Sequence, residues 1–162
     1  MLKERMTAKD VLDAYWDGAL PVRPISIARS MGIEVFKSST LGHSGQVQLG
    51  KDNETPIIVF NDSEALVRQR FTIAHEIGHY ALGHLNDSKQ MFRDDSKNFT
   101  AFQYDTREVE ANQFAAAFLM PAEVVRLAVQ QGTRSVSTLA DMFRVSEAAM
   151  KYRLISLGML SG

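Results

Sequence analysis

Residues 72–79, Thr72-Ile73-Ala74-His75-Glu76-Ile77-Gly78-His79, contain an H-E-x-x-H pattern. On an α-helix, residues four apart lie on the same face, so His75 and His79 can approach one cation with Glu76 beside it. Two neutral imidazoles in this arrangement bind zinc, and the neighbouring carboxylate accepts a proton from the attacking water. The pattern therefore predicts a metal site on a helix.

The residues around this pattern predict a helix over residues 63–85. Its apolar side chains recur on one stripe, formed by Leu66, Ile73, Ala74, Ile77, Ala81 and Leu85. His79 and Glu76 point away from that stripe, so core packing does not explain them, and the alternative is a solvated pair of histidines. Gly78 favours the metal site. A glycine inside a helix costs about 1 kcal/mol relative to alanine, and we expect it to allow close approach of another backbone.

A catalytic zinc needs a third protein ligand, which must here be His, Glu or Asp because the chain has no cysteine. His84 follows His79 by five residues and points to the opposite side of a continuous helix, so it does not close the site. A better source of the ligand is a second, alanine-rich helix predicted over residues 106–120.

On that second helix, Glu108 and Asn112 share a face that the small residues Ala111 and Ala115 border, which permits tight packing on the first helix. We predict Glu108 as the third ligand and Asn112 as a supporting group that orients an imidazole N–H. Glu110 is the alternative ligand, but it lies on another face, where a solvated charge is expected.

Two segments, "RQRFTIAHEIGHYALGH" and "REVEANQFAAAFLMP", resemble the ImmA/IrrE family of bacterial and phage metallo-endopeptidases. The resemblance extends over "PVRPISIARSMGIEVF", "GQVQLGKDNETPIIVFND" and "STLADMFRVSEAAMKYRLISLGML". It implies that His75, His79 and Glu108 hold the metal and that Glu76 is the general base. Asn112 stands where many relatives have aspartate, so its support to the ligand is uncharged.

The resemblance also implies a function. It indicates an endopeptidase that uses one zinc ion, with manganese compatible with the same ligands. The implied substrate is a regulatory protein such as a helix-turn-helix repressor, encoded nearby, whose cleavage derepresses stress-response or mobile-element genes. The competing function is a non-catalytic, metal-stabilised regulator that binds DNA or protein through its C-terminal segment. An intact Glu76 favours the enzyme, since a purely structural site needs no base.

Composition fits a small intracellular enzyme. The chain has 162 residues, 45% of them hydrophobic, which is enough for a core. Its net charge of −1 gives no bulk attraction to nucleic acid or to an anionic membrane. The N-terminus lacks an apolar signal core, and no run of 18 apolar residues occurs. We expect a soluble, cytoplasmic protein with no membrane partner; the sequence indicates no oligomeric state.

The predicted fold class is α+β. Strands are expected at Ile33-Glu34-Val35-Phe36 and in a hairpin of residues 45–49 and 56–60. They would form a small antiparallel three-stranded sheet packed on a helical, zincin-like core. We divide the chain into a metallopeptidase domain, residues 1–131, and a helix-turn-helix-like C-terminal helical segment, residues 132–162.

Three further features admit both a functional and a structural interpretation. The edge of the strand at residues 45–49 can bind substrate as an added strand or merely complete the core. His43 can polarise a substrate carbonyl in the cleft or lie on the surface. Residues 86–105 form a long irregular stretch, in which Tyr104 can hydrogen-bond the developing oxyanion or anchor the loop.

The C-terminal segment supports the second functional hypothesis. Ser137 is expected to cap one helix, and the turn Arg144-Val145-Ser146 leads into another over residues 147–157. The exposed face of that helix offers Lys151 and Arg153 beside Glu147, a thin positive footprint for phosphate. We therefore expect no direct DNA binding and favour a packing element that helps to hold a protein substrate.

Overall fold

The computed structural model describes residues 4–85, 92–94 and 105–161. These residues form seven helices and one four-stranded sheet: α1 (Ala8–Tyr15), α2 (Pro24–Ser30), β1 (Glu34–Ser38), β2 (Gly45–Leu49), β3 (Pro56–Asn61), α3 (Leu66–Ala81), β4 (Phe92–Asp94), α4 (Thr106–Leu119), α5 (Ala122–Gln130), α6 (Val136–Phe143) and α7 (Glu147–Ser156). The α+β class is confirmed.

The sheet has the strand order β1-β3-β2-β4. The predicted hairpin is present as antiparallel β2 and β3, but the antiparallel three-stranded sheet is wrong, because β1 pairs in parallel with β3. In the sheet, β3 lies between β1 and β2. Strand β1 therefore pairs with β3, which runs in the same direction as β1, and does not pair with the antiparallel β2. β4 adds a fourth strand from a stretch expected to be irregular.

Strand β2 is therefore internal to the sheet over part of its length. Residues Gly45, Gln46 and Val47 pair with β3 on one side and with β4 on the other. The interpretation of this segment as a free edge for a substrate strand is wrong over these three residues, since their backbone groups already have partners.

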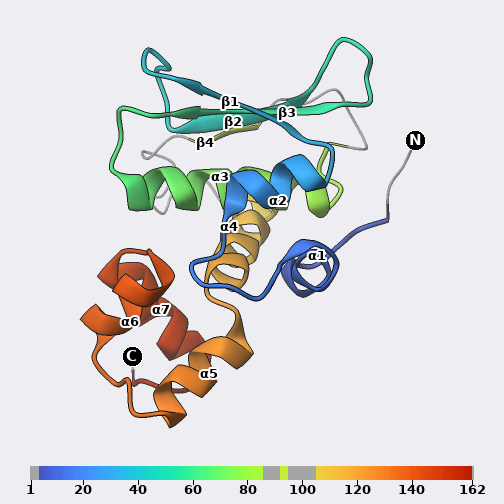
Figure 1. Cartoon of the computed structure of the whole chain (residues 1–162). Helices are drawn as coiled ribbons and strands as arrows, with labels where there is room; N and C mark the ends of the chain where they lie inside the picture. Colours follow the sequence, from blue (N-terminus) through green and yellow to red (C-terminus); the bar gives the residue numbers. More distant parts are fainter. Residues whose placement is uncertain (1–3, 86–91, 95–104, 162) are drawn as a thin grey trace.

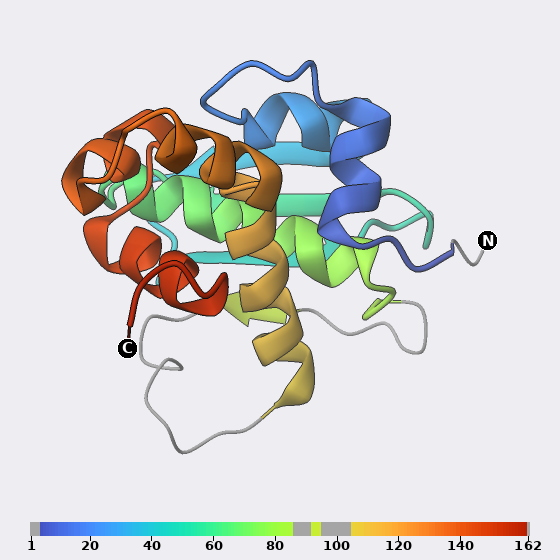
Figure 2. The same ribbon diagram turned by 90° about the horizontal axis from the view of Figure 1, so that it is seen from below.

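The elements stack in layers below the sheet. In Figure 1, α3 and α2 lie against one face of the sheet, and α4 crosses α3 on the side away from the strands. Figure 2, seen from below, shows α4 crossing over α3 with α5, α6 and α7 grouped beside them. This layer order puts the middle of α3 between the sheet and α4, where its side chains are covered from both sides.

Helix α3 lies inside the predicted range of residues 63–85, but its first turn departs from the predicted core stripe. Its N-cap is Ala65, whose side chain makes no capping hydrogen bond, and Gln69 Nε2 instead donates to the Asp62 and Glu64 carbonyl oxygens. Leu66 is 73% exposed and lies outside the core, because this turn extends beyond the cover of the neighbouring elements. From Thr72 onward the helix is largely buried.

Helix α4 packs against α3 more extensively than any other pair of described elements. Ala111 and Ala115 are fully buried, as expected for small residues at a close helix crossing. A Cβ atom at Gly78 would lie 3.0 Å from the Phe114 side chain, so this glycine accommodates an aromatic ring rather than the backbone that we expected. The contact fixes where the first turn of α4 lies.

Two arginines attach the C-terminal helices to this core. Arg70 of α3 donates hydrogen bonds to the carbonyl oxygens of Val22, Phe143 and Arg144. Arg153 of α7 donates through Nε to the Met120 carbonyl oxygen at 2.9 Å. Arg153 is therefore half-buried in packing, and its predicted place on an exposed, phosphate-binding face is wrong.

Helix α6 begins two residues earlier than predicted, since Ser135 rather than Ser137 is its N-cap and accepts from the Thr138 N–H. The α6–α7 turn passes through Arg144 at φ 55°. The division of the chain at residues 131 and 132 stays a prediction. None of the helices built from the described residues has the length and apolar character that a membrane span requires.

Replacing Gly45 should destabilise the fold at the place where β2 passes over α3. A Cβ atom there would overlap Thr72 Cγ2 and lie 3.2 Å from the Val59 carbonyl oxygen. We expect Gly45→Ala to lower the free energy of unfolding by about 1–3 kcal/mol, measured by urea denaturation. Gly42→Ala is the matched control, because nothing lies within 4 Å of its Cβ position. Equal stabilities of the two variants would contradict the expected overpacking.

Candidate metal centre

Helices α3 and α4 bring two imidazoles and a carboxylate to one point. His75 Nε2 and His79 Nε2 lie 3.2 Å apart. Glu108 Oε1 lies 3.3 Å from His75 Nε2, and Glu108 Oε2 lies 2.6 Å from His79 Nε2. Glu76 belongs to the same cluster, since ligand atoms of His75, Glu76 and His79 all lie within 4.8 Å of one another. The predicted helix-face relation between His75, His79 and Glu108 is thus present in space.

The contact of His75 Nδ1 with Asn112 determines whether Nε2, the ring nitrogen that faces the cluster, carries a proton. His75 Nδ1 lies 2.8 Å from Asn112 Oδ1, and an amide oxygen can only accept. Nδ1 therefore carries the proton, and Nε2 of a neutral ring presents a lone pair to the cluster. Asn112 thus lies where we predicted a supporting group.

Burial sets the charges in the cluster. It lowers the pKa of His79 to about 4, because desolvation disfavours the imidazolium more than Glu108 stabilises it. Burial opposes ionisation of Glu108, whose side chain is only 26% exposed, but in the metal-free protein a proton on Nε2 of His75 or His79 is donated to its carboxylate, and this lowers its pKa to about 2. At neutral pH, His79 is neutral and Glu108 is ionised, as a divalent metal requires.

The spacing of these atoms fits a metal ion. Ligands about 2.0–2.2 Å from a tetrahedral zinc lie about 3.3–3.6 Å from one another. The distances of 3.2 Å between the two Nε2 atoms and 3.3 Å from His75 to Glu108 agree with this, while the 2.6 Å contact of His79 with Glu108 is shorter. Lone pairs and a carboxylate converge here, and a cation between them would offset their repulsion. The N₂O donor set accepts zinc and also manganese.

Glu76 lies beside the imidazoles and between α3 and the sheet. It is fully buried, together with both carboxylate oxygens. Its Oε2 lies 3.6 Å from the position that a Cβ atom at Gly45 would occupy, so β2 forms the neighbouring wall. A buried carboxylate next to two metal-binding imidazoles is in the position that a proton acceptor needs.

His84 occupies a different place from the one predicted on a continuous helix. Helix α3 ends at Ala81, and Gly83 then adopts φ 80°. The His84 N–H donates to the His79 carbonyl oxygen and the Gly83 N–H to that of Tyr80, the two hydrogen bonds of a Schellman motif. This turn folds His84 back onto His79, with the two Nδ1 atoms 2.8 Å apart.

Glu110 also departs from its predicted role as a solvated charge. Its Oε1 lies 3.0 Å from His84 Nε2, and its Oε2 lies 2.9 Å from the Arg5 guanidinium. His84 and Glu110 are thus two residues of the site that helical-wheel reasoning missed. The signal for the first was Gly83, since a glycine after a helix marks a left-handed C-terminal cap that reverses the chain.

The two weaker candidates lie elsewhere. The structure joins His43 to Gln46 of β2, with Nε2 2.9 Å from Gln46 Oε1, rather than to the imidazole cluster. Tyr104 falls outside the described residues. The roles of both residues in substrate binding stay predictions.

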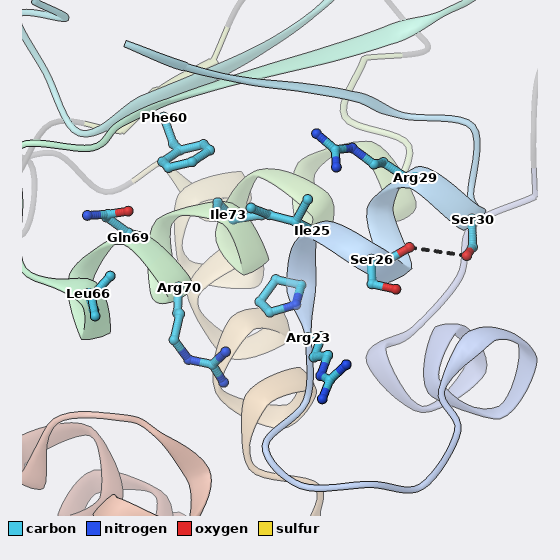
Figure 3. A pocket seen from close by; sticks show the side chains of 11 residues that line it. Arg23, Ile25, Ser26, Arg29, Ser30, Phe60, Leu66, Gln69, Arg70 and Ile73 are labelled. Carbon is cyan, nitrogen blue, oxygen red and sulfur yellow. Dashed lines mark hydrogen bonds between the residues drawn. The ribbon is translucent and has the colours of Figure 1, made fainter. Parts of the chain in front are cut away.

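A pocket beside the sheet is separate from this cluster. It has a volume of about 800 Å³ and lies between α2, α3 and β3, with Arg23, Arg29 and Arg70 around an apolar floor of Ile25, Phe60 and Ile73 (Figure 3). Its α3 residues lie on the face opposite His75 and His79. The pocket therefore contributes no side chain to the candidate metal centre.

A buried H-E-x-x-H pair with a carboxylate from a second helix defines a metallopeptidase-type site. Residues 28–155 match the peptidase M78 family, described as the IrrE N-terminal-like domain, and the chain belongs to this family. The resemblance to ImmA/IrrE proteins is thereby confirmed. Membership supports a peptidase-type enzyme with a metal site.

A solved structure supports the fold. The chain is similar to a Mycobacterium tuberculosis transcriptional regulator, with a TM-score of 0.57 and 23% sequence identity over 81% of this chain. The match covers 40% of that longer chain, and at this identity it bears on the fold alone. A search among curated proteins finds no match.

The candidate ligands should bind one divalent ion. We expect about one equivalent of zinc per chain after mild dialysis of the wild type, and a sharp loss in His79→Ala, measured by elemental analysis. Glu108→Gln should also weaken zinc binding, because the amide lacks the negative charge. His43→Ala is the matched control and should retain the ion. Unchanged metal content in His79→Ala would rule out this set of ligands.

Proposed function

We propose that the protein is a zinc-dependent endopeptidase in which His75, His79 and Glu108 hold the ion and Glu76 is the general base. The observation that carries the proposal is the convergence of two imidazole lone pairs and an ionised carboxylate beside a second, buried carboxylate. A structural site would need ligands but no neighbouring Glu76. Membership of the peptidase M78 family supports the same conclusion.

In this mechanism, a bound zinc ion supplies Lewis-acid activation of a water molecule and of the scissile carbonyl. Glu76 accepts the proton of the attacking water on a carboxylate oxygen and later delivers it to the leaving amine. Asn112 accepts from His75 Nδ1–H and keeps Nε2 of that ring directed into the site. Burial of the cluster excludes bulk water and strengthens each of these interactions.

We propose a protein substrate that is a regulator, such as a helix-turn-helix repressor encoded nearby, whose cleavage derepresses stress-response or mobile-element genes. The resemblance to the ImmA/IrrE family supports this proposal. Manganese in place of zinc remains compatible with the donor set.

We further propose that the C-terminal helices form a helix-turn-helix-like unit that holds this substrate on a zincin-like core. The buried residues Ala140 and Val145, at the helix crossing and in the turn, support the first point. An apolar groove of about 390 Å³ between α3, α4 and α7 supports the second; its lining includes Phe71, Asn112, Ala116, Met120, Ala149 and Tyr152. It shares Asn112 with the candidate metal centre, so an apolar substrate side chain there would lie close to the cluster.

The alternative is a non-catalytic regulator that binds DNA through α7. Arg153 is engaged by the Met120 carbonyl, which leaves Lys151 beside Glu147 on the exposed part of this helix. The two proposals are separated by incubating the protein and zinc with the regulator encoded next to it. The enzyme should make one defined cut, and a chelator should abolish it. A specific, salt-sensitive shift of promoter DNA without cleavage would favour the alternative.

Glu76→Gln should separate catalysis from metal binding. The amide cannot accept a proton, so we expect kcat to fall at least about 100-fold while the metal content and the unfolding midpoint stay as in the wild type. Glu123→Gln, an exposed substitution of the same kind, should leave cleavage unchanged. Wild-type cleavage rates in Glu76→Gln would exclude this residue as the base.

Tyr152→Ala should test the groove. This side chain is 61% exposed and lines the groove, so its removal should raise KM several-fold and leave kcat and metal content unchanged. Lys151→Ala is the neighbouring control, because Lys151 does not line the groove, and its KM should equal that of the wild type. Equal KM values for Tyr152→Ala and the wild type would contradict substrate binding at this surface.

A further inference from the structure

A continuous line of hydrogen bonds leads from the candidate ligand His79 to the N-terminal segment. His79 Nδ1 contacts His84 Nδ1 at 2.8 Å, and His84 Nε2 contacts Glu110 Oε1 at 3.0 Å. Glu110 Oε2 accepts from the Arg5 guanidinium at 2.9 Å, and Arg5 also donates to the Leu82 carbonyl oxygen at 3.2 Å. The line therefore joins three segments of the chain: the end of α3, the second turn of α4, and the residues before α1.

The direction of each hydrogen bond follows from the partners. His79 Nε2 must present its lone pair to bind a metal, so a neutral His79 carries its proton on Nδ1 and donates it outward. His84 Nδ1 then accepts, which leaves the His84 proton on Nε2, directed at Glu110 Oε1. One pair of neutral tautomers thus satisfies the His79–His84 and His84–Glu110 contacts, and the line ends on a carboxylate that Arg5 keeps charged.

We propose that His84 and Glu110 are positioning residues for the metal ligand His79. The outward hydrogen bond fixes the His79 tautomer and ring orientation, and the carboxylate at the end of the line makes the imidazole a stronger donor to the metal. The inference rests on the proposed function only in taking His79 as a ligand. It goes beyond that function by assigning roles to a histidine and a glutamate that bind neither metal nor substrate.

The two imidazole ligands are supported unequally. His75 donates to the neutral amide of Asn112, whereas His79 is connected through His84 to a carboxylate. His84 is nearly completely buried, and Glu110 is partly exposed. His79 is therefore connected to a negative charge, that of Glu110, through the intervening His84. His75 has no such connection through Asn112, whose amide is neutral.

The left-handed turn at Gly83 is what allows this support. In a Schellman motif, the residue after the left-handed position lies against the residue five before it, where an apolar contact is usual. Here the two positions are His84 and His79, and an imidazole pair takes the place of that apolar contact. The motif that ends α3 thus also carries the group that orients its last metal ligand.

The test measures zinc affinity by competition with a chromophoric chelator, which requires no substrate. We expect the Kd for zinc to rise about 10–100-fold in His84→Ala and in Glu110→Ala. Glu110→Gln keeps an acceptor but loses the charge, so its Kd should rise less than that of Glu110→Ala. Asp13→Asn, which removes an exposed carboxylate paired with Lys9, is the control and should bind zinc as the wild type does.

A double variant tests whether the two residues act in series. If Glu110 acts through His84, then His84→Ala combined with Glu110→Ala should weaken zinc binding no more than His84→Ala alone. Independent, multiplying effects would contradict the proposed line. Unfolding midpoints of the metal-free variants separate lost positioning from lost folding, and the Glu110 variants remain informative if His84→Ala does not fold.

Nitrogen-15 NMR of the histidine rings tests the proposed line directly, because the line requires one particular tautomer of His84. In the zinc-loaded protein, His84 should carry its proton on Nε2, with Nδ1 unprotonated. A proton on His84 Nδ1, or zinc affinities of both alanine variants within twofold of the wild type, would overturn the proposal. A wild type that binds zinc in this way but cleaves no protein would refute the proposed function and leave this inference intact.

Discussion

The close packing of α4 against α3 brings together residues that lie 29 positions apart in the chain, His79 and Glu108. It depends on small residues: Gly78 on α3 receives the Phe114 side chain, and Ala111 and Ala115 of α4 are fully buried. Because Glu108 lies in the first turn of α4, this crossing sets the position of its carboxylate. The candidate metal centre is thus a consequence of helix packing, and no single segment of the chain contains it.

The second constraint is the cost of burying polar groups. His75, Glu76 and His79 lie in a region that is otherwise apolar, where an unsatisfied nitrogen or oxygen costs roughly 1–3 kcal/mol. The outer nitrogens of both imidazoles have partners in Asn112 and His84. Their inner nitrogens instead converge with Glu108, an arrangement that favours a cation. The same hydrogen bonds that make burial tolerable therefore also direct the lone pairs inward.

Two arginine side chains, Arg70 and Arg153, connect the C-terminal helices to this core by hydrogen bonds to backbone carbonyl oxygens. Arg70 reaches three carbonyl oxygens, and Arg153 reaches that of Met120 at the end of α4. Each guanidinium satisfies acceptors at the ends of helices or in turns, where carbonyl groups lack helical partners. The charges of these two arginines are thus used within the molecule, and the groove beside α7 is apolar. This surface is better suited to an apolar side chain of a protein than to a phosphate backbone.

Local features could be predicted from the order of residues alone: the helix that carries His75 and His79, the β2–β3 hairpin, and Glu108 and Asn112 on one face of the next helix. Helical periodicity and strand patterns depend on neighbours in the chain, so they can be read from it. Tertiary structure decided what depends on distant partners. It made β1 parallel to β3 and gave β2 a second neighbour, β4. It used Arg153 in packing. His84 was assigned to the wrong side because a helical wheel assumes a continuous helix, whereas Gly83 reverses the chain two residues after α3 ends. The partner of His84, Glu110, comes from α4 and is brought close only by the tertiary fold.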